Sequence, residues 1–116
     1  MRTKIPFVLA SLALLTLVAC TSIPPVSEIP ASIANATTAA DHQRIADYFA
    51  QKAASYDAEA ALHEKMALSY GSTRPRADPA AMMSHCRSMR DQFASAAKEA
   101  RALEQAHRQL SSSTGK

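Results

Sequence analysis

The chain has 116 residues and a formal net charge of +3, and 47% of its residues are hydrophobic. Its only glycines are Gly71 and Gly115, which excludes a glycine-rich loop that cradles phosphate. A chain this short builds only a small core, so we expect one domain that is reinforced by contact with other chains.

The first 19 residues predict a signal peptide. Arg2 and Lys4 give a short positive start, and an apolar run follows over residues 5–19. This run is shorter than the roughly 20 residues that a helix needs to cross a bilayer. A charged start, a short apolar run and a small residue before the cleavage point are typical of a secretory signal peptide.

Residues 17–20 read LVAC, and this motif at the end of the apolar run resembles the lipobox of bacterial lipoproteins. In that family the signal peptide is cleaved before the cysteine, whose thiol receives a diacylglycerol and whose amine is acylated. The resemblance implies a membrane anchor on Cys20. Thr21 stands where an aspartate would favour the inner membrane, so the family rule implies the outer membrane, with the domain facing the periplasm. The alternative is an ordinary signal peptide that happens to end at a cysteine.

Residues 20–38 are interpreted as the lipidated cysteine followed by a flexible tether. The stretch 21–38 holds three of the six prolines and many serines and threonines, a composition typical of extended linkers. Removal of Arg2 and Lys4 with the signal peptide lowers the net charge from +3 to +1. The mature chain then lacks the clustered basic charge that nucleic-acid binding requires, and we expect no nucleic-acid partner.

Two long helices are predicted over about residues 39–70 and 79–110. Both stretches are rich in alanine, which raises helix propensity, and neither is interrupted by glycine or proline. Between them lies GSTRPRADP, which ends in Asp78 as an N-cap and Pro79 as a first helical residue. No strand alternation appears. The predicted fold is all-α, an antiparallel two-helix hairpin over residues 39–112 with a frayed tail at 113–116.

The spacing of residues predicts a coiled-coil-like contact between these helices, because the candidates alternate in steps of three and four. In the first helix they are His42, Ile45, Phe49, Lys52, Tyr56, Glu59, His63, Met66 and Tyr70. In the second they are Met82, Cys86, Met89, Phe93, Ala96, Ala100, Leu103, His107 and Leu110. Dimerisation of such a hairpin would give a four-helix bundle.

The register of the hairpin follows from the position of the loop. If the loop is centred between residues 74 and 75, Tyr56 lies level with Phe93, and Glu59 lies level with Arg90. The same register pairs three further sets of residues, with His85 beside the seam: His63 with Cys86, Met66 with Met83, and His42 with His107.

Three interpretations of Cys86 stay open, since it is the only thiol left if Cys20 carries lipid. Imidazole, thiolate and thioether together suit Cu(I), and the first two suit zinc. Cys86 could instead join two chains through a disulfide, or simply pack as a small apolar group. The predicted metal ligands are His63, Cys86, Met66, Met83 and His85 near the loop, and His42 with His107 at the open end.

The predicted function is not enzymatic. No serine has a supporting histidine and carboxylate, and a two-helix hairpin offers no deep pocket for a substrate. We expect a lipid-anchored cell-envelope lipoprotein without a cofactor. Its hairpin would contact other copies of itself or another envelope protein in a structural or assembly role. The alternative is a periplasmic copper- or zinc-binding lipoprotein that uses the histidine, cysteine and methionine residues of the seam.

Overall fold

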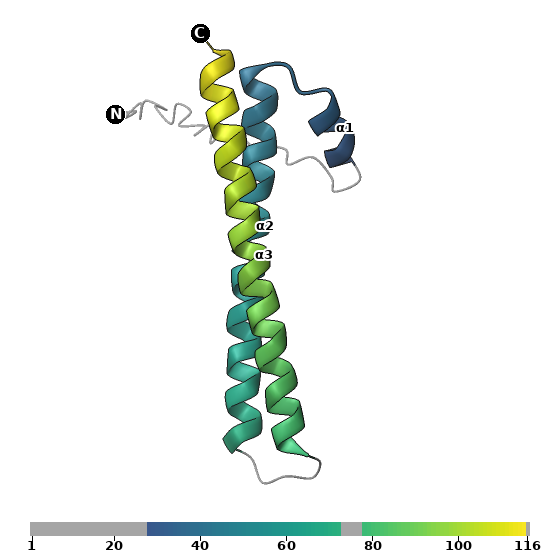
Figure 1. Cartoon of the computed structure of the whole chain (residues 1–116), viewed down its shortest axis with the longest axis vertical. Helices are drawn as coiled ribbons and strands as arrows, with labels where there is room; N and C mark the ends of the chain where they lie inside the picture. The colour runs from purple at the N-terminus through teal and green to yellow at the C-terminus, as the bar shows by residue number, and fades with distance from the viewer. Residues whose placement is uncertain (1–27, 73–77, 116) are drawn as a thin grey trace, which may run out of the picture.

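The computed structural model describes residues 28–72 and 78–115. Three helices follow one another: α1 (Ile29–Ala34), α2 (Ala39–Ser72) and α3 (Pro79–Thr114). α2 and α3 lie side by side in opposite directions, and α1 folds back beside the N-terminal part of α2 (Figure 1). Within the described residues there is no strand. The predicted all-α class and the pairing of two long helices are therefore confirmed.

Both long helices continue past their predicted ends. α2 runs to Ser72, so Gly71 lies inside its last turn and does not end the helix. α3 runs to Thr114 and takes in residues for which a frayed tail was expected. Near the loop the two helices approach closely, because a Cβ atom placed on Gly71 would lie 3.4 Å from Sδ of Met83.

The start of α3 is as predicted. Asp78 is the N-cap, and its carboxylate accepts hydrogen bonds from the backbone N–H groups of Ala80 and Ala81 at 3.1 and 3.3 Å. Pro79 follows as the first helical residue, where its missing N–H has no consequence.

The segment expected as an extended tether contains α1, which is a correction to that expectation for residues 29–34. The physical reason is Ile29, whose side chain is 7% exposed and therefore has an apolar surface to cover. α1 contacts α2 and makes no contact with α3 in the described residues. Ile45 and Tyr48 of α2 are buried as well, at 1% and 9% exposure.

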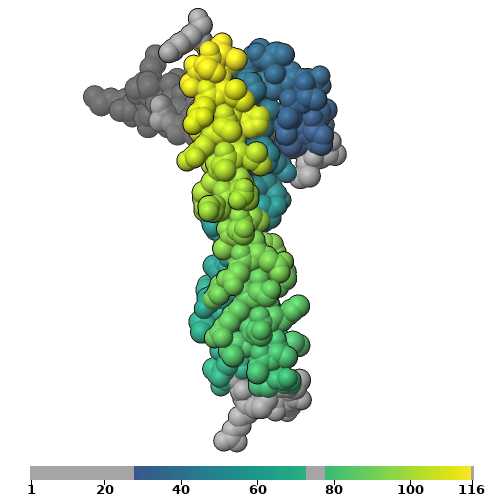
Figure 2. All heavy atoms as spheres, viewed as in Figure 1, coloured from purple at the N-terminus to yellow at the C-terminus, as the bar shows by residue number. Residues whose placement is uncertain are grey.

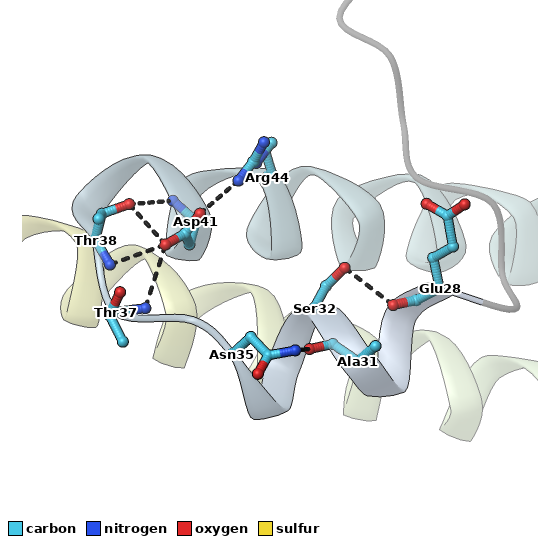
Figure 3. Close-up of polar contacts among 8 residues, drawn as sticks. All are labelled: Glu28, Ala31, Ser32, Asn35, Thr37, Thr38, Asp41 and Arg44. Atoms are coloured by element: carbon cyan, nitrogen blue, oxygen red, sulfur yellow. Dashed lines mark hydrogen bonds and ion pairs between the residues drawn. The ribbon is translucent and has the colours of Figure 1, made fainter.

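A capping box forms at the start of α2, just after the segment that follows α1. Oγ1 of Thr38 accepts a hydrogen bond from the backbone N–H of Asp41 at 3.1 Å, and the Asp41 carboxylate accepts from the N–H of Thr38 at 3.0 Å (Figure 3). Thr37 donates its own N–H to the same carboxylate, and Arg44 forms an ion pair with it. Hydrogen bonds from Thr38 and Thr37 hold the pKa of Asp41 well below its ordinary value. The reciprocal bonds fix where α2 begins.

The contact surface of α2 differs from the predicted seam. Aromatic rings recur every seven residues as expected, at His42, Phe49, Tyr56, His63 and Tyr70. Between them lie alanines, of which Ala46, Ala53 and Ala67 are buried at 0–3% exposure. The predicted seam instead placed Lys52 and Glu59 there, with the Lys52 ammonium reaching out to water and the Glu59 carboxylate at a cost in desolvation. Alanine avoids that cost and lets the helix axes approach.

α3 shows the same one-residue rotation. Cys86 and Ala100 are buried as predicted, but the second row of its contact surface includes Ala97, at 0% exposure, and not Ala96. Leu103 and Leu110, both placed in the seam by the sequence, are 46% and 45% exposed. The small residues of both helices therefore meet each other, and several larger apolar side chains remain outside.

The register is shifted by about half a heptad from the prediction. Phe93 contacts the rings of both Tyr56 and His63, at centroid distances of 6.2 and 5.5 Å. Arg90 pairs with Glu64 at 2.5 Å, so its predicted pairing with Glu59 is wrong. Each ring of α3 fits between two rings of α2 that are seven residues apart, which is knobs-into-holes packing.

Candidate functional site

The open end of the hairpin brings two histidines into contact, as the sequence predicted. Nδ1 of His42, near the start of α2, lies 3.2 Å from Nδ1 of His107, near the end of α3. The ring of His107 also stacks on Phe49 at a centroid distance of 6.1 Å. Two imidazole nitrogens from opposite helices thus point at one another beside an aromatic ring.

This contact constrains the protonation of the pair. A hydrogen bond between two Nδ1 atoms needs one protonated and one unprotonated nitrogen, so the bond is lost when both rings are charged. Partial burial, followed by the charge of His42, lowers the pKa of His107. The pair is therefore held with at least one neutral ring, which is the form that can also bind a metal ion.

The set predicted near the loop is more dispersed. Met83 lies against Gly71, and Met66 is 36% exposed on α2. His85 is exposed on α3. The register shift is the reason, because it moves each residue of α3 toward the loop end of α2. His63 and Cys86 remain in the seam, and Nδ1 of His63 is buried without a hydrogen-bond partner in the described residues.

Cys86 has a free thiol that is 6% exposed. Phe93 fits between Tyr56 and His63, so the seven-residue step places Cys86 between His63 and Tyr70. A small apolar group suits that position, because the neighbouring alanine row keeps the helices close. Its burial would hinder a disulfide to a second chain, since the hairpin would have to open first.

Within residues 28–72 and 78–115, no group of three or more histidine, cysteine, aspartate or glutamate side chains is arranged to hold a metal ion. His42 and His107 are two ligands, and a metal held there would need further ligands from water or another chain.

An apolar surface lies on one side of the hairpin, and the sequence did not predict it. A groove of about 280 Å³ lies between α2 and α3 and is lined in part by Tyr48, Lys52, Glu99 and Leu103. Seven-residue steps from these lining positions reach further exposed apolar side chains on both helices. We call the outer face the surface formed by Leu62 and Met66 of α2 and Met82, Leu103 and Leu110 of α3, which are 36–50% exposed.

Ion pairs occupy the other side of the seam. Arg90 pairs with Glu64, Arg101 with Asp57, and Arg108 with Asp47 at 3.6 Å. Each pair links α2 to α3, and exposed pairs of this kind contribute at most about 1 kcal/mol each. Their position makes the two sides of the hairpin different: one is ion-paired, and the other is the outer face.

Comparison with known proteins gives no relative. No protein-family model, curated protein or solved structure matches the chain. The lipobox and Cys20 lie outside the described residues. None of the helices in the described part of the chain is both long and apolar enough to cross a bilayer.

Proposed function

We propose that this chain is a lipid-anchored lipoprotein of the bacterial cell envelope whose helical hairpin acts by protein contact, without catalysis. The observation that carries the contact role is the outer face, where five large apolar side chains are 36–50% exposed on one side of a slender hairpin. Such surfaces on small proteins are typical of interaction sites. The anchor is supported by the order of charged start, apolar run and LVAC motif in residues 1–20.

The proposal includes self-association of the hairpin into a four-helix bundle, with the outer membrane as the place of the anchor and the periplasm as the surroundings of the domain. A two-helix hairpin covers only one stripe of each helix, and five large apolar residues here lie outside that stripe. Packing against further helices is the way in which bundles cover such residues.

Substitution of Cys20 tests the anchor. Cys20→Ala should yield an uncleaved precursor that takes up no labelled palmitate, whereas Cys86→Ala should be processed and labelled like the natural chain. Mass spectrometry of the membrane fraction gives both results. A Cys20→Ala chain that is still cleaved and lipid-modified would refute the lipoprotein assignment.

The His42–His107 contact favours a second candidate, metal binding by the envelope lipoprotein. Two nitrogen ligands of a tetrahedral zinc ion, each about 2.0–2.1 Å from the metal, are about 3.3–3.4 Å apart. The observed Nδ1–Nδ1 distance of 3.2 Å is close to this. Copper also accepts imidazole ligands.

Titration of the full chain in neutral detergent with Zn²⁺ or Cu(I) tests this candidate. We expect His42→Ala and His107→Ala to weaken binding by at least about tenfold, since each removes one of two ligands. His85→Ala is the matched control, because His85 is exposed on α3. Binding that is lost equally in the control, or kept in both seam variants, would reject this site.

A further inference from the structure

We propose that the outer face is the contact surface between two copies of this chain, which pack face to face with their loops pointing in the same direction. The inference deepens the proposed contact role, and its direction of packing rests on the proposed lipid anchor. Five large exposed apolar side chains lie on this face, and they come from both helices. A second copy would present the same surface, as the interface of a two-fold dimer requires.

The chain itself shows that this side of α2 accepts a helix. Tyr48 and Lys52 line the groove. Ile45 lies seven residues before Lys52, so it is on the same side of α2. Both Ile45 and Tyr48 are buried although they lie beside the alanine row, and α1 is the described element that contacts α2 there. Figure 2 shows α1 beside the end of the hairpin opposite the loop. The free part of the outer face thus continues an interface that already exists.

The charges on this face complement each other under one arrangement. Lys52 of α2 and Glu99 of α3 both line the groove, and the register places them at the same height. They are not joined by an ion pair, although both are described; the Lys52 ammonium lies 4.9 Å from the centre of the Tyr56 ring. A two-fold axis along the hairpin places α2 of one copy opposite α3 of the other. Each Lys52 then faces Glu99 of the second copy.

The anchor selects the same arrangement. Two copies held by Cys20 on one membrane have their N-terminal ends on the same side, so their hairpins point the same way. The opposite arrangement, with the axis across the hairpins, would place α2 against α2 and Lys52 away from Glu99. Among the described elements α1 contacts α2 and not α3, and it lies at the open end, on the side of Leu110. The contact between copies is therefore formed by the groove, which includes Leu103, and by Leu62, Met66 and Met82 nearer the loop.

The first test compares two polar substitutions in the full chain. Leu103→Gln removes an exposed apolar side chain from the groove, and Leu68→Gln removes one that is 60% exposed on the side of the ion pairs. Native mass spectrometry from neutral detergent should show a dimer that Leu103→Gln weakens by about tenfold or more, as substitutions at the centre of an interface do. Leu68→Gln should leave it unchanged. Both side chains are exposed in the single chain, so circular dichroism should show equal helix content.

The second test separates pairing between copies from pairing within one. Lys52→Glu leaves two acidic residues in each copy, and Glu99→Lys leaves two basic residues. Each variant alone should dimerise more weakly than the natural chain. A mixture, with one variant labelled with ¹⁵N, should form the heterodimer in preference to either homodimer, because every contact between copies is then Glu with Lys.

Three results would overturn the inference. They are a chain that is monomeric at all concentrations, a dimer that Leu103→Gln and Leu68→Gln affect equally, and a mixture without preference for the heterodimer. The same spectra report the acyl chains on Cys20. A lipidated monomer would therefore overturn the dimer and leave the proposed anchor standing, whereas an unlipidated dimer would do the reverse.

Discussion

At the scale of single residues, the His42–His107 pair links the sequence pattern to a measurable property. Both histidines occupy ring positions of the seam, so they meet although the overall register was predicted incorrectly. A ring of α3 touches two rings of α2 that lie on either side of it, and the predicted register identified one of these two neighbours. The pairing of Tyr56 with Phe93 was predicted correctly for the same reason.

The pair should make stability depend on pH. The pKa of His107 is lowered in the folded chain, so folding disfavours its charged form. The unfolded chain then binds more protons than the folded chain. The contribution of His107 to the free energy of unfolding is therefore fully present above the ordinary pKa of 6.5, and it decreases as the pH falls below that value. Urea unfolding at pH 7.5 and 5.5 should show this decrease, and His107→Gln should reduce it.

His85→Gln is the control for that experiment, because His85 is exposed. The carboxylate of Asp41 does not interfere: its pKa is lowered from 3.8, so its contribution to stability is lost only at more acidic pH. A decrease of the same size in the natural chain and in His107→Gln would show that the pair is not its source.

At the scale of elements, alanine explains what the sequence could and could not predict. The existence and starting points of the two long helices, the Asp78 cap and the ring positions follow from propensity, capping and spacing. The second row of the seam does not, because the spacing of Ile45, Met66 and Leu103 predicts a row that lies one residue before the alanines. The helices instead approach through Ala46, Ala53 and Ala97, which are 0–3% exposed. Burial of these small residues leaves the larger ones on the outer face.

Two neighbouring alanines on α3 test this account. Ala97→Leu adds three carbon atoms where exposure is 0%, so we expect it to lower the free energy of unfolding by about 1–3 kcal/mol. Ala96→Leu adds the same atoms beside the outer groove and should be tolerated. Thermal unfolding of both variants distinguishes the structure from the predicted seam, for which Ala96→Leu would be the harmful change.

α1 was missed for a related reason. Prolines and small polar residues dominate the composition of residues 20–38, and nothing in the spacing of the three isoleucines among them singles out Ile29. A signal was present in TTAAD, where Thr38 and Asp41 have the spacing of a capping box. The capping box marks where α2 begins, but it does not specify the path of the residues before it.

At the scale of the whole molecule, the docking of α1 should depend on one side chain. Ile29→Ala truncates the only buried side chain of α1, so we expect the docking of α1 onto α2 to weaken by about 2 kcal/mol. We expect α1 to detach while the hairpin stays folded. Ile33→Ala is the control, because Ile33 is 44% exposed. Hydrogen exchange should show reduced protection around Ile45 and Tyr48 in the first variant only. Equal protection in both variants would contradict this role of Ile29.

The position of α1 also limits how far the hairpin can lie from a lipid anchor on Cys20. If Cys20 carries the acyl chains, seven residues lie between it and Glu28, where the described structure begins, so eight Cα–Cα steps join the two. An extended chain covers at most about 3.6 Å per residue, so the linker from Cys20 to Glu28 is shorter than about 30 Å. With α1 detached from α2, the linker would extend from Cys20 to Thr38 and would be more than twice as long. With such an anchor, docked α1 would hold the hairpin near the membrane surface, and release of α1 would more than double the distance at which the protein could meet a partner.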